Sequence, residues 1–430
     1  MSKRQLKLGA FLLHNGHHVA AWRHPQADDG SNPLKLYQHL AQTAERACFD
    51  AVFFSDSVAL TGGVGGLEPL TLLSALAAVT EHIGLIGTAT TTYNEPYHVA
   101  RKFASLDRIS AGRAGWNLVT SDNASEAANF GRQEHVAHSD RYARAREFHE
   151  VVRGLWNSWE DDAILNDKEG GKQFDPEKLH PLRHKGEHFS VAGPLNVSRS
   201  PQGHPIVVQA GGSEAGKNLA AETADVVFTA HPTLASAQQF YADLKQRVRN
   251  AGRSEDSLKI MPGLFPIVGR THEEADEKFN VLQDLVLPKD GLALLGRMIG
   301  NFDLSSYPID APLPELPLTT SGQQSRQKLL TSLAQGENLS IRELYLRIAG
   351  GRGHFTLVGT PEHIADQMQL WFENGAADGF NIMPPYLSGG LTDFAELVVP
   401  ELQRRGLVRT KYEGSTLRDN LGLSFPTRQR

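Results

Sequence analysis

Short apolar runs alternate along most of this 430-residue chain with longer segments that repeat apolar residues at helical spacing. The runs are rich in β-branched and aromatic residues and end in polar or glycine-rich turns, which is typical of buried parallel strands. Eight runs predict strands, at residues 6–13, 51–57, 83–92, 114–121, 206–208, 226–230, 258–268 and 379–385. Most of them precede a segment whose spacing predicts a helix, such as 34–49, 96–109 and 233–250.

Strands that alternate with helices predict an α/β fold, and eight such repeats fit a closed barrel better than a doubly wound open sheet. We therefore predict a single (β/α)8 TIM barrel domain over residues 1–430, with insertions at about 160–200 and 288–354. The first insertion is polar, with one hairpin predicted at 184–193. The second holds clustered prolines and a helical pattern at 325–346. An interruption of that length is usually a lid or an oligomer contact.

Polar residues gather at the carboxyl ends of the predicted strands, where a parallel barrel carries its chemistry. The residues at these ends are His14, Asp56, Thr88–Thr92, Asn117–Ser121, Gln209–Ser213 and Asn381. Asp56 could act as a general base, accept a hydrogen bond from a ligand N–H, or form an Asx turn. The strand ends are therefore where we expect a functional site.

The turn after the fifth predicted strand, AGGSEAG at 210–216, has the features of a phosphate-binding turn. Gly211 and Gly212 remove the side chains that keep an anion away from the backbone. Ser213 is a predicted N-cap, and the helix behind it directs N–H groups and the positive end of its dipole at the same place. The sequence matches neither a Walker A motif nor GxGxxG, so an ordinary strand-to-helix turn remains the alternative.

Histidines concentrate after the first predicted strand, in the segment HNGHHVAAWRH at 14–24. They lack the HxH or HExxH spacing that fixes metal ligands, so loop residues, a substrate contact or a proton-transferring group are the other interpretations. His138 and Tyr142 begin a predicted helix four residues apart, so both can face one point near its N-terminus. That geometry suits an anion, although Ser139 could equally be a plain N-cap with His138 at the surface.

Composition excludes several classes of function. The formal net charge is −6 with 21% charged residues, and no cluster of Lys and Arg indicates a nucleic-acid or membrane-surface binder. The one cysteine, Cys48, lies in an apolar helical pattern and predicts a small core residue in a reducing compartment. The first apolar run breaks at His14, too early for a signal peptide or a membrane span, so we expect a cytoplasmic protein. No Ser-His-Asp order or paired-carboxylate motif points to hydrolysis.

Several long motifs closely resemble those of one enzyme family. They are GHHVAAWRHP, AERACFDAVFFSDS, IGLIGTATTTYNEPYHVARKFASLDRISAGRAGWNLVTS, HSDRYARA, VVRGLWNSWEDDA, GPLNVSRSPQGHPIVVQAGGSEAG and the ending TLRDNLGL. With these motifs the sequence resembles the nitrilotriacetate and dibenzothiophene-sulfone monooxygenases, two-component FMN-dependent enzymes of the bacterial-luciferase-like group. The resemblance extends from about residue 5 to residue 430.

The resemblance implies an enzyme that uses FMN as FMNH2 and O2 as co-substrate, with the FMNH2 supplied by a separate NAD(P)H-dependent flavin reductase. Matched position by position, it implies that Asp56 and Thr88 contact the flavin ring region. It implies that His138 and Tyr142 lie on the FMN side of the pocket and that Ser213 holds the phosphate. No metal is implied. These positions coincide with the strand ends and the helix start that the residues themselves mark.

The resemblance further gives His18, in the G-x-H-x-x-x-W pattern, as a candidate catalytic residue that donates a proton or contacts substrate. Gly212 stands at a variable place of the family's turn, which should leave phosphate binding intact. The implied reaction oxygenates a small N- or S-containing organic compound with C–N or C–S cleavage. The implied assembly is a homodimer or a homotetramer.

The substrate itself is left open by the sequence. Aminopolycarboxylates, aryl sulfones, small sulfides and S-substituted cysteines are all handled by relatives. We expect the discriminating side chains in the first loop and in 288–354. Candidates for contacts with a carboxylated or aromatic substrate, each of which could equally be a packing or surface residue, are Trp22, Arg23, Trp116 and Arg352.

Three other functions remain open from the sequence. A deazaflavin-dependent oxidoreductase of the same superfamily would share the barrel and need no O2. A metal-dependent amidohydrolase barrel would use the histidines at 14–24. A non-catalytic flavin-binding or light-emitting accessory protein would leave Asp56 and the polar strand ends without a chemical role.

Overall fold

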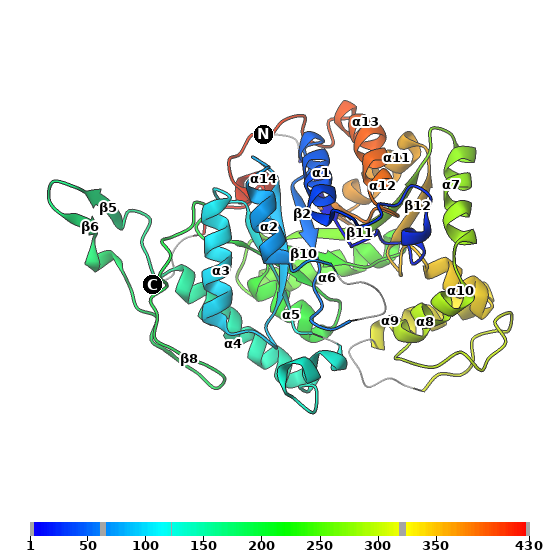
Figure 1. Ribbon diagram of the computed structural model, residues 1–430, viewed down its shortest axis with the longest axis horizontal. Coiled ribbons are helices and arrows are strands. Elements are labelled where there is room, and N and C mark those ends of the chain that lie inside the picture. The colour runs from blue at the N-terminus through cyan, green and yellow to red at the C-terminus, as the bar shows by residue number, and fades with distance from the viewer. Residues whose placement is uncertain (1–3, 61–65, 122, 318–323, 427–430) are drawn as a thin grey trace.

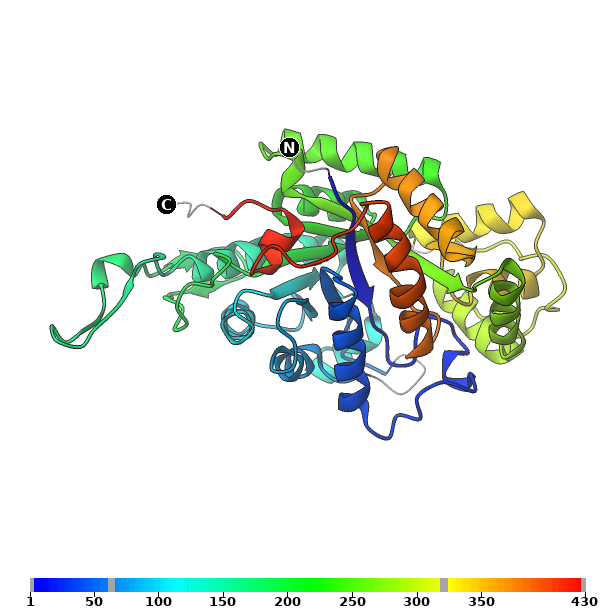
Figure 2. The same ribbon diagram turned by 90° about the horizontal axis from the view of Figure 1, so that it is seen from above.

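A closed barrel of eight parallel strands, surrounded by helices, forms the centre of the molecule (Figure 1 and Figure 2). The computed structural model describes residues 4–60, 66–121, 123–317 and 324–426. In ring order the barrel strands are β1 (Lys7–Phe11), β2 (Ala51–Phe54), β3 (Gly84–Thr90), β4 (Ala114–Val119), β9 (Ile206–Ala210), β10 (Val226–Thr229), β11 (Lys259–Val268) and β13 (Gly379–Ile382). Each coincides with a predicted strand, so the predicted (β/α)8 barrel is confirmed.

Pairings at β1 and at β11 close the ring. β1 pairs with β2 on one side and with β13 on the other, so that Gly9 is opposite both Ala51 and Asn381. β11 pairs with β10 over its first residues and with β13 at Gly263, which returns the sheet to its start. Because every one of these pairings is parallel, the carboxyl ends of the strands lie together at one rim.

A further parallel strand, β12 (Phe355–Gly359), lies outside the ring and is missing from the sequence prediction. It pairs with the second half of β11, from Leu264 to Val268. β11 is ten residues long, so this half extends past the barrel and offers its backbone groups to another partner. The run FTLVG follows the irregular second insertion, and its short alternation alone does not indicate a strand.

Helices cover the outside of the barrel and begin at residues that cap their first turn. Asn32, Thr233 and Thr271 accept hydrogen bonds from backbone N–H groups at three of these starts. The helices are α1 (Pro33–Arg46), α2 (Pro69–Ala77), α3 (Pro96–Ile109), α4 (His138–Trp156), α5 (Glu214–Thr223), α6 (Leu234–Asn250), α7 (His272–Asp284), α11 (Pro361–Glu373), α12 (Gly389–Asp393) and α13 (Val399–Arg404). None of the helices in the described ranges combines the length and the apolar character that a bilayer crossing requires.

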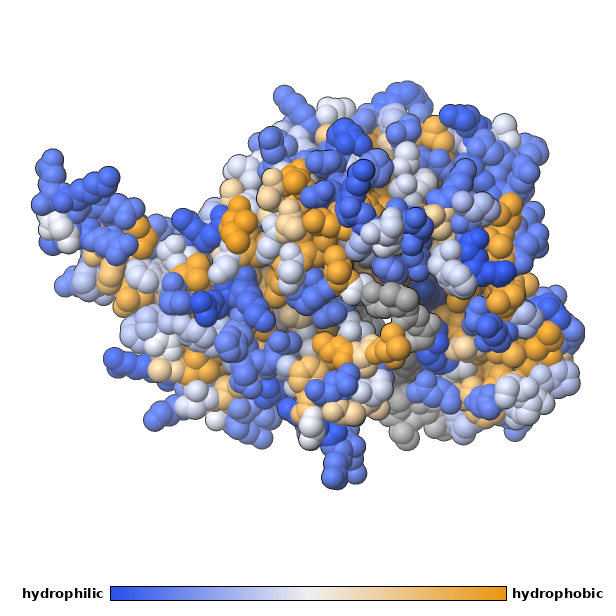
Figure 3. Space-filling model, viewed as in Figure 1, coloured by the Kyte–Doolittle hydropathy of each residue, from blue (hydrophilic) through white to orange (hydrophobic). Residues whose placement is uncertain are grey.

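The first insertion forms an arm that projects from the barrel (Figure 1 and Figure 2). It holds two hairpins, β5 (Ile164–Asp167) with β6 (Lys172–Phe174) and β7 (His184–Lys185) with β8 (Ser190–Val191). The predicted hairpin is the second of these. The first was missed because its strands are almost fully exposed and carry no apolar alternation. The face of the arm seen in Figure 3 is largely hydrophilic.

The second insertion folds into helices that pack on one another around an apolar core of their own. They are α8 (Pro288–Met298), α9 (Gln324–Glu337) and α10 (Ile341–Ile348). The single helical pattern predicted over 325–346 is therefore two helices. Ser340 separates them because it begins α10 with a capping box to Glu343.

The C-terminal segment closes the amino end of the barrel. Helix α14 (Leu417–Leu421) lies there, and Leu417, Leu421 and Leu423 pack against inward-facing barrel side chains. The side chains in this layer are Ala51, Phe53, Ile86, Ile206, Val208, Val226 and Met261. A small molecule therefore reaches the interior from the opposite end, at the carboxyl rim.

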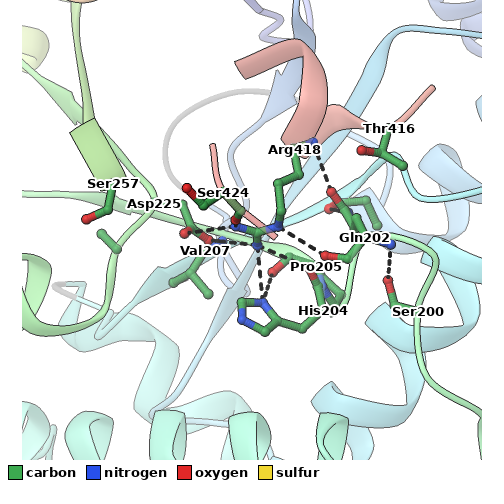
Figure 4. A network of polar contacts seen from close by, with 12 residues as sticks. Ser200, Gln202, His204, Pro205, Val207, Asp225, Ser257, Thr416, Arg418 and Ser424 are labelled. Atoms are coloured by element: carbon green, nitrogen blue, oxygen red, sulfur yellow. Dashed lines mark hydrogen bonds and ion pairs between the residues drawn. The ribbon is translucent and has the colours of Figure 1, made fainter. Parts of the chain in front are cut away.

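Arg418 attaches this segment to the barrel (Figure 4). Its guanidinium donates to the carbonyl oxygens of Gln202 (3.1 Å) and His204 (3.3 Å) and to both carboxylate oxygens of Asp225 (3.4 Å each). Asp225 also accepts from the backbone N–H of Val207 at 2.9 Å. Burial opposes the charge of Asp225 and is the largest single influence on its pKa. The charges of Arg418, His204 and Arg253 and the hydrogen bond from Val207 together outweigh it, so the pKa of that carboxyl lies below its usual value.

We expect Arg418→Met to lower the free energy of unfolding by about 3–5 kcal/mol, because it leaves the buried carboxylate of Asp225 without its cation. The matched control is Arg404→Met, which removes an exposed arginine from its ion pair with Glu401 and should cost about 1 kcal/mol or less. Urea unfolding followed by tryptophan fluorescence measures both. Equal, small losses in the two variants would show that Arg418 does not hold the C-terminal segment.

Candidate active site

Aromatic rings line the barrel interior below the carboxyl rim. The ring centroid of Phe11, at the end of β1, lies 4.7 Å from that of Phe53 and 5.4 Å from that of Phe228. Phe53 belongs to the layer of side chains that α14 contacts, and the other two rings pack against that layer. Because water is scarce beside such an apolar layer, polar groups next to it interact strongly with a ligand.

Thr88 lies in the barrel wall and is only 4% exposed. Its hydroxyl donates to the carbonyl oxygen of Phe54 at 2.8 Å and accepts from Nδ2 of Asn117 at 2.8 Å. The other amide atom, Asn117 Oδ1, is buried and has no hydrogen-bond partner among the described residues. Buried polar atoms are normally hydrogen-bonded, so an acceptor without a partner on this wall points to a donor on a ligand.

The structure brings Ser213 and Tyr142 together. Ser213 caps α5, and its Oγ accepts from the backbone N–H of Gly216 at 3.1 Å. Tyr142 Oη, from α4, lies 3.3 Å from the same Oγ. A Cβ atom added at Gly211 or Gly212 would meet no atom within 4 Å, so the turn opens onto space. Two hydroxyls, the N–H groups of a helix start and an open approach fit a phosphate group.

Asp56, Thr88 and Ser213 belong to neighbouring strands or to the turns that follow them. β2, β3, β4 and β9 are consecutive in the ring, and we call the rim that they form the first arc. Asp56 is exposed on this rim. Partial desolvation, followed by the charges of Glu68 and Glu126, raises the pKa of its carboxyl. Three of the predicted cofactor-binding positions thus share one side of the mouth.

The two predicted histidines lie elsewhere or are not described. His18 is 2% exposed; its Nδ1 accepts from the backbone N–H of Ala20 at 3.2 Å, and its Nε2 lies 3.5 Å from Oε1 of Gln283 in α7. Burial lowers the pKa of His18 to about 4, so the ring is neutral at pH 7. Its role in proton transfer or substrate contact stays a prediction. His138 begins α4, but its side chain lies outside the described residues.

A second group of buried polar atoms belongs to the other half of the barrel, whose rim, formed by β10, β11, β13 and β1, we call the second arc. His354 stacks on Phe228 with ring centroids 5.1 Å apart. It occupies the space beside Gly263, where a Cβ would lie 2.3 Å from His354 Nδ1. In the described part of the chain, His354 Nδ1, His17 Nδ1 and Asn381 Oδ1 are buried without a hydrogen-bond partner.

Sequence reasoning marked Asn381 as a strand end and His17 as one of a cluster, but it missed His354. His17 Nε2 donates to the carbonyl oxygen of Phe11 at 2.9 Å. Burial lowers the pKa of both histidines, that of His354 to about 3, so both rings are neutral at pH 7. His354 ends an insertion without a strand-helix rhythm, so no local pattern connects it with the mouth. Among the described residues, no group of three or more His, Cys, Asp or Glu side chains is placed to hold a metal ion.

Known proteins match this chain over most of its length. The sequence pattern of the luciferase-like monooxygenases matches residues 15–378. N-acetyl-S-(2-succino)cysteine monooxygenase of Bacillus subtilis is 53% identical over 99% of this chain and 98% of that protein. Nitrilotriacetate monooxygenase component A of Aminobacter aminovorans is 51% identical over the same two shares. A solved structure of riboflavin lyase with modified FMN and riboflavin has a TM-score of 0.86 at 33% identity, covering 98% of this chain and 96% of that chain.

Both relatives are monooxygenases that align with this chain nearly from end to end. The solved structure shares its barrel. The chain therefore is an oxygenating enzyme and belongs to the luciferase-like monooxygenase family.

Proposed function

We propose that the protein is the oxygenating component of a two-component system. It uses FMNH2, made by a separate NAD(P)H-dependent flavin reductase, and O2 to oxygenate a small N- or S-containing organic compound with C–N or C–S cleavage. The observation that carries this proposal is the open turn at Gly211 and Gly212, with Ser213 Oγ facing Tyr142 Oη at 3.3 Å. Two similar proteins support it. One is component A of nitrilotriacetate monooxygenase, and the other, riboflavin lyase, was solved with a modified FMN.

The first arc holds the cofactor in this proposal. Reduced FMN, when bound, supplies the electrons that activate O2. Ser213 Oγ, Tyr142 Oη and the backbone N–H groups at the start of α5 would donate hydrogen bonds to its phosphate. Asp56 and Thr88 border the ring region. Asn117 Oδ1, which has no partner among the described residues, accepts a hydrogen bond from a ring N–H.

The aromatic layer and the second arc prepare the space for the substrate. Phe11, Phe53 and Phe228 keep water from the interior, so that polar contacts made there are poorly screened. His17 and His354 stay neutral at pH 7 because they are buried, so they can exchange hydrogen bonds with a substrate without adding charge. The substrate therefore approaches the cofactor from the side opposite the phosphate turn.

Purified protein given photoreduced FMN, O2 and a panel of N- and S-containing compounds should convert a substrate with no reductase present. The reason is that the reductase contributes only FMNH2. Product analysis by mass spectrometry, together with O2 uptake, measures this. The parallel reaction with a reduced deazaflavin should give no product. Product that forms with the reduced deazaflavin and not with FMNH2 would contradict the proposal.

Ser213→Ala should weaken FMN binding roughly tenfold or more, because it removes a hydroxyl that donates to a charged phosphate. It should leave the binding of riboflavin, which has no phosphate, unchanged. The substitution also removes an N-cap, so Ser340→Ala, which removes the serine cap of α10, serves as the control and should not change FMN affinity. Flavin fluorescence titrations measure all of these affinities. Wild-type FMN affinity in Ser213→Ala would place the phosphate elsewhere.

A further inference from the structure

Arg352 is a cation at the barrel mouth that no carboxylate of the described residues neutralises. Its Nη2 donates to the carbonyl oxygen of His17 at 2.9 Å, while its Nε is buried and has no hydrogen-bond partner in the described ranges. The backbone φ of Arg352 is 49°, a left-handed conformation that is uncommon for a residue with a side chain. Such conformations cluster at functional sites, where the surrounding structure holds them in place.

The electrostatic surroundings of Arg352 are positive. Burial, followed by the charges of Arg326 and Arg297, lowers the pKa of its guanidinium to about 10. Among the described residues, no acidic group has a resolved influence on this pKa. Proteins keep buried charges paired because removing a charge from water without a counter-charge is costly. A negatively charged ligand would supply the counter-charge that the described residues of the chain do not.

The second arc adds acceptors of hydrogen bonds, not charge. His17 Nε2 carries the proton, since it donates to the carbonyl oxygen of Phe11, so His17 Nδ1 is an acceptor. Asn381 Oδ1 is also an acceptor, and both atoms are buried without a partner among the described residues. A molecule that fits all of these groups combines an anionic end for Arg352 with an N–H donor.

This anion position is distinct from the phosphate turn. Arg352 is held by His17 in the loop after β1, whereas Ser213 follows β9. β1 and β9 are four strands apart in both directions around the ring of eight, so they stand opposite each other. A phosphate at Ser213 therefore leaves Arg352 to a different anion.

We propose that Arg352 binds a carboxylate of the substrate and so selects carboxylates that also carry an N–H group, that is, amino- or amidocarboxylates. This inference rests on the proposed function for the reaction that follows binding. A guanidinium binds a carboxylate through two parallel hydrogen bonds, which uses the Nε that has no partner in the described structure. His17 Nδ1, on the residue that Arg352 contacts, accepts from the N–H of the same molecule. Arg352 is thus the residue that determines specificity.

The test is calorimetric binding of three probes to the protein in metal-free buffer, with and without FMN. Iminodiacetate has two carboxylates and an N–H group, its dimethyl ester lacks the charges, and glutarate replaces the nitrogen by a methylene. Arg352→Gln removes the cation, and Arg352→Lys keeps the positive charge but cannot form the bidentate pair of hydrogen bonds with a carboxylate. The matched control is Arg347→Gln, which changes an exposed arginine of α10 whose partner Glu337 lies 3.7 Å away.

We expect Arg352→Gln to weaken iminodiacetate binding roughly ten- to a hundredfold, Arg352→Lys to weaken it less, and Arg347→Gln to leave it unchanged. On the wild-type protein, the dimethyl ester should bind at least about tenfold more weakly than the diacid, and glutarate should bind more weakly than iminodiacetate. Unchanged binding in Arg352→Gln, or an ester that binds as tightly as the acid, overturns the inference. If Arg352→Gln does not fold, Arg352→Lys and the ester comparison decide.

The proposed function fails or survives independently of this result. If the protein binds iminodiacetate through Arg352 but does not bind FMN, the carboxylate site is supported and the proposed function is wrong. If the protein oxygenates neutral sulfides or sulfones with FMNH2, and Arg352→Gln does not change the rates, the proposed function is supported and the inference about Arg352 is wrong.

Discussion

Closure of the parallel sheet is the constraint on which the rest of the structure depends. Because β10 pairs with β11 and β1 pairs with β13, the carboxyl ends of all eight strands must lie at one rim. Helix α14 fills the other end, where Arg418 is paired with Asp225. The polar groups of the interior are therefore directed to a single mouth. Arg352 and His17, which are 335 positions apart in sequence, become hydrogen-bonded neighbours there.

The two arcs of this mouth meet a ligand by different physical means. At Ser213 and Tyr142 the first arc offers hydroxyls and the N–H groups of a helix start, which suit a phosphate. The second arc places one guanidinium, Arg352, in poorly hydrated surroundings, where its attraction for an anion is weakly screened. His17 and His354 are neutral at pH 7, so they do not add to the positive charge around it.

The parts of this arrangement that sequence predicts are those with local signals. Apolar runs followed by helical spacing predict the barrel, and the glycines and cap at Ser213 indicate an open turn that could hold a phosphate. The motif HSDRYARA, at the start of a predicted helix, indicates Tyr142 through its resemblance to the family. By contrast, β12 and His354 lie beside their partners, β11 and Phe228, because the second insertion returns the chain to the barrel. Likewise, no short segment of sequence shows that Arg352 has no carboxylate partner among the described residues, because this depends on residues that are distant in sequence and meet only at the mouth.

A crystal structure of the protein with FMN and iminodiacetate both bound tests the central claim most directly. The account predicts the FMN phosphate at Ser213 and the start of α5, a carboxylate on the guanidinium of Arg352, and the flavin ring inside the mouth between them. An FMN phosphate bound at Arg352, or a flavin bound outside the barrel mouth, would contradict it.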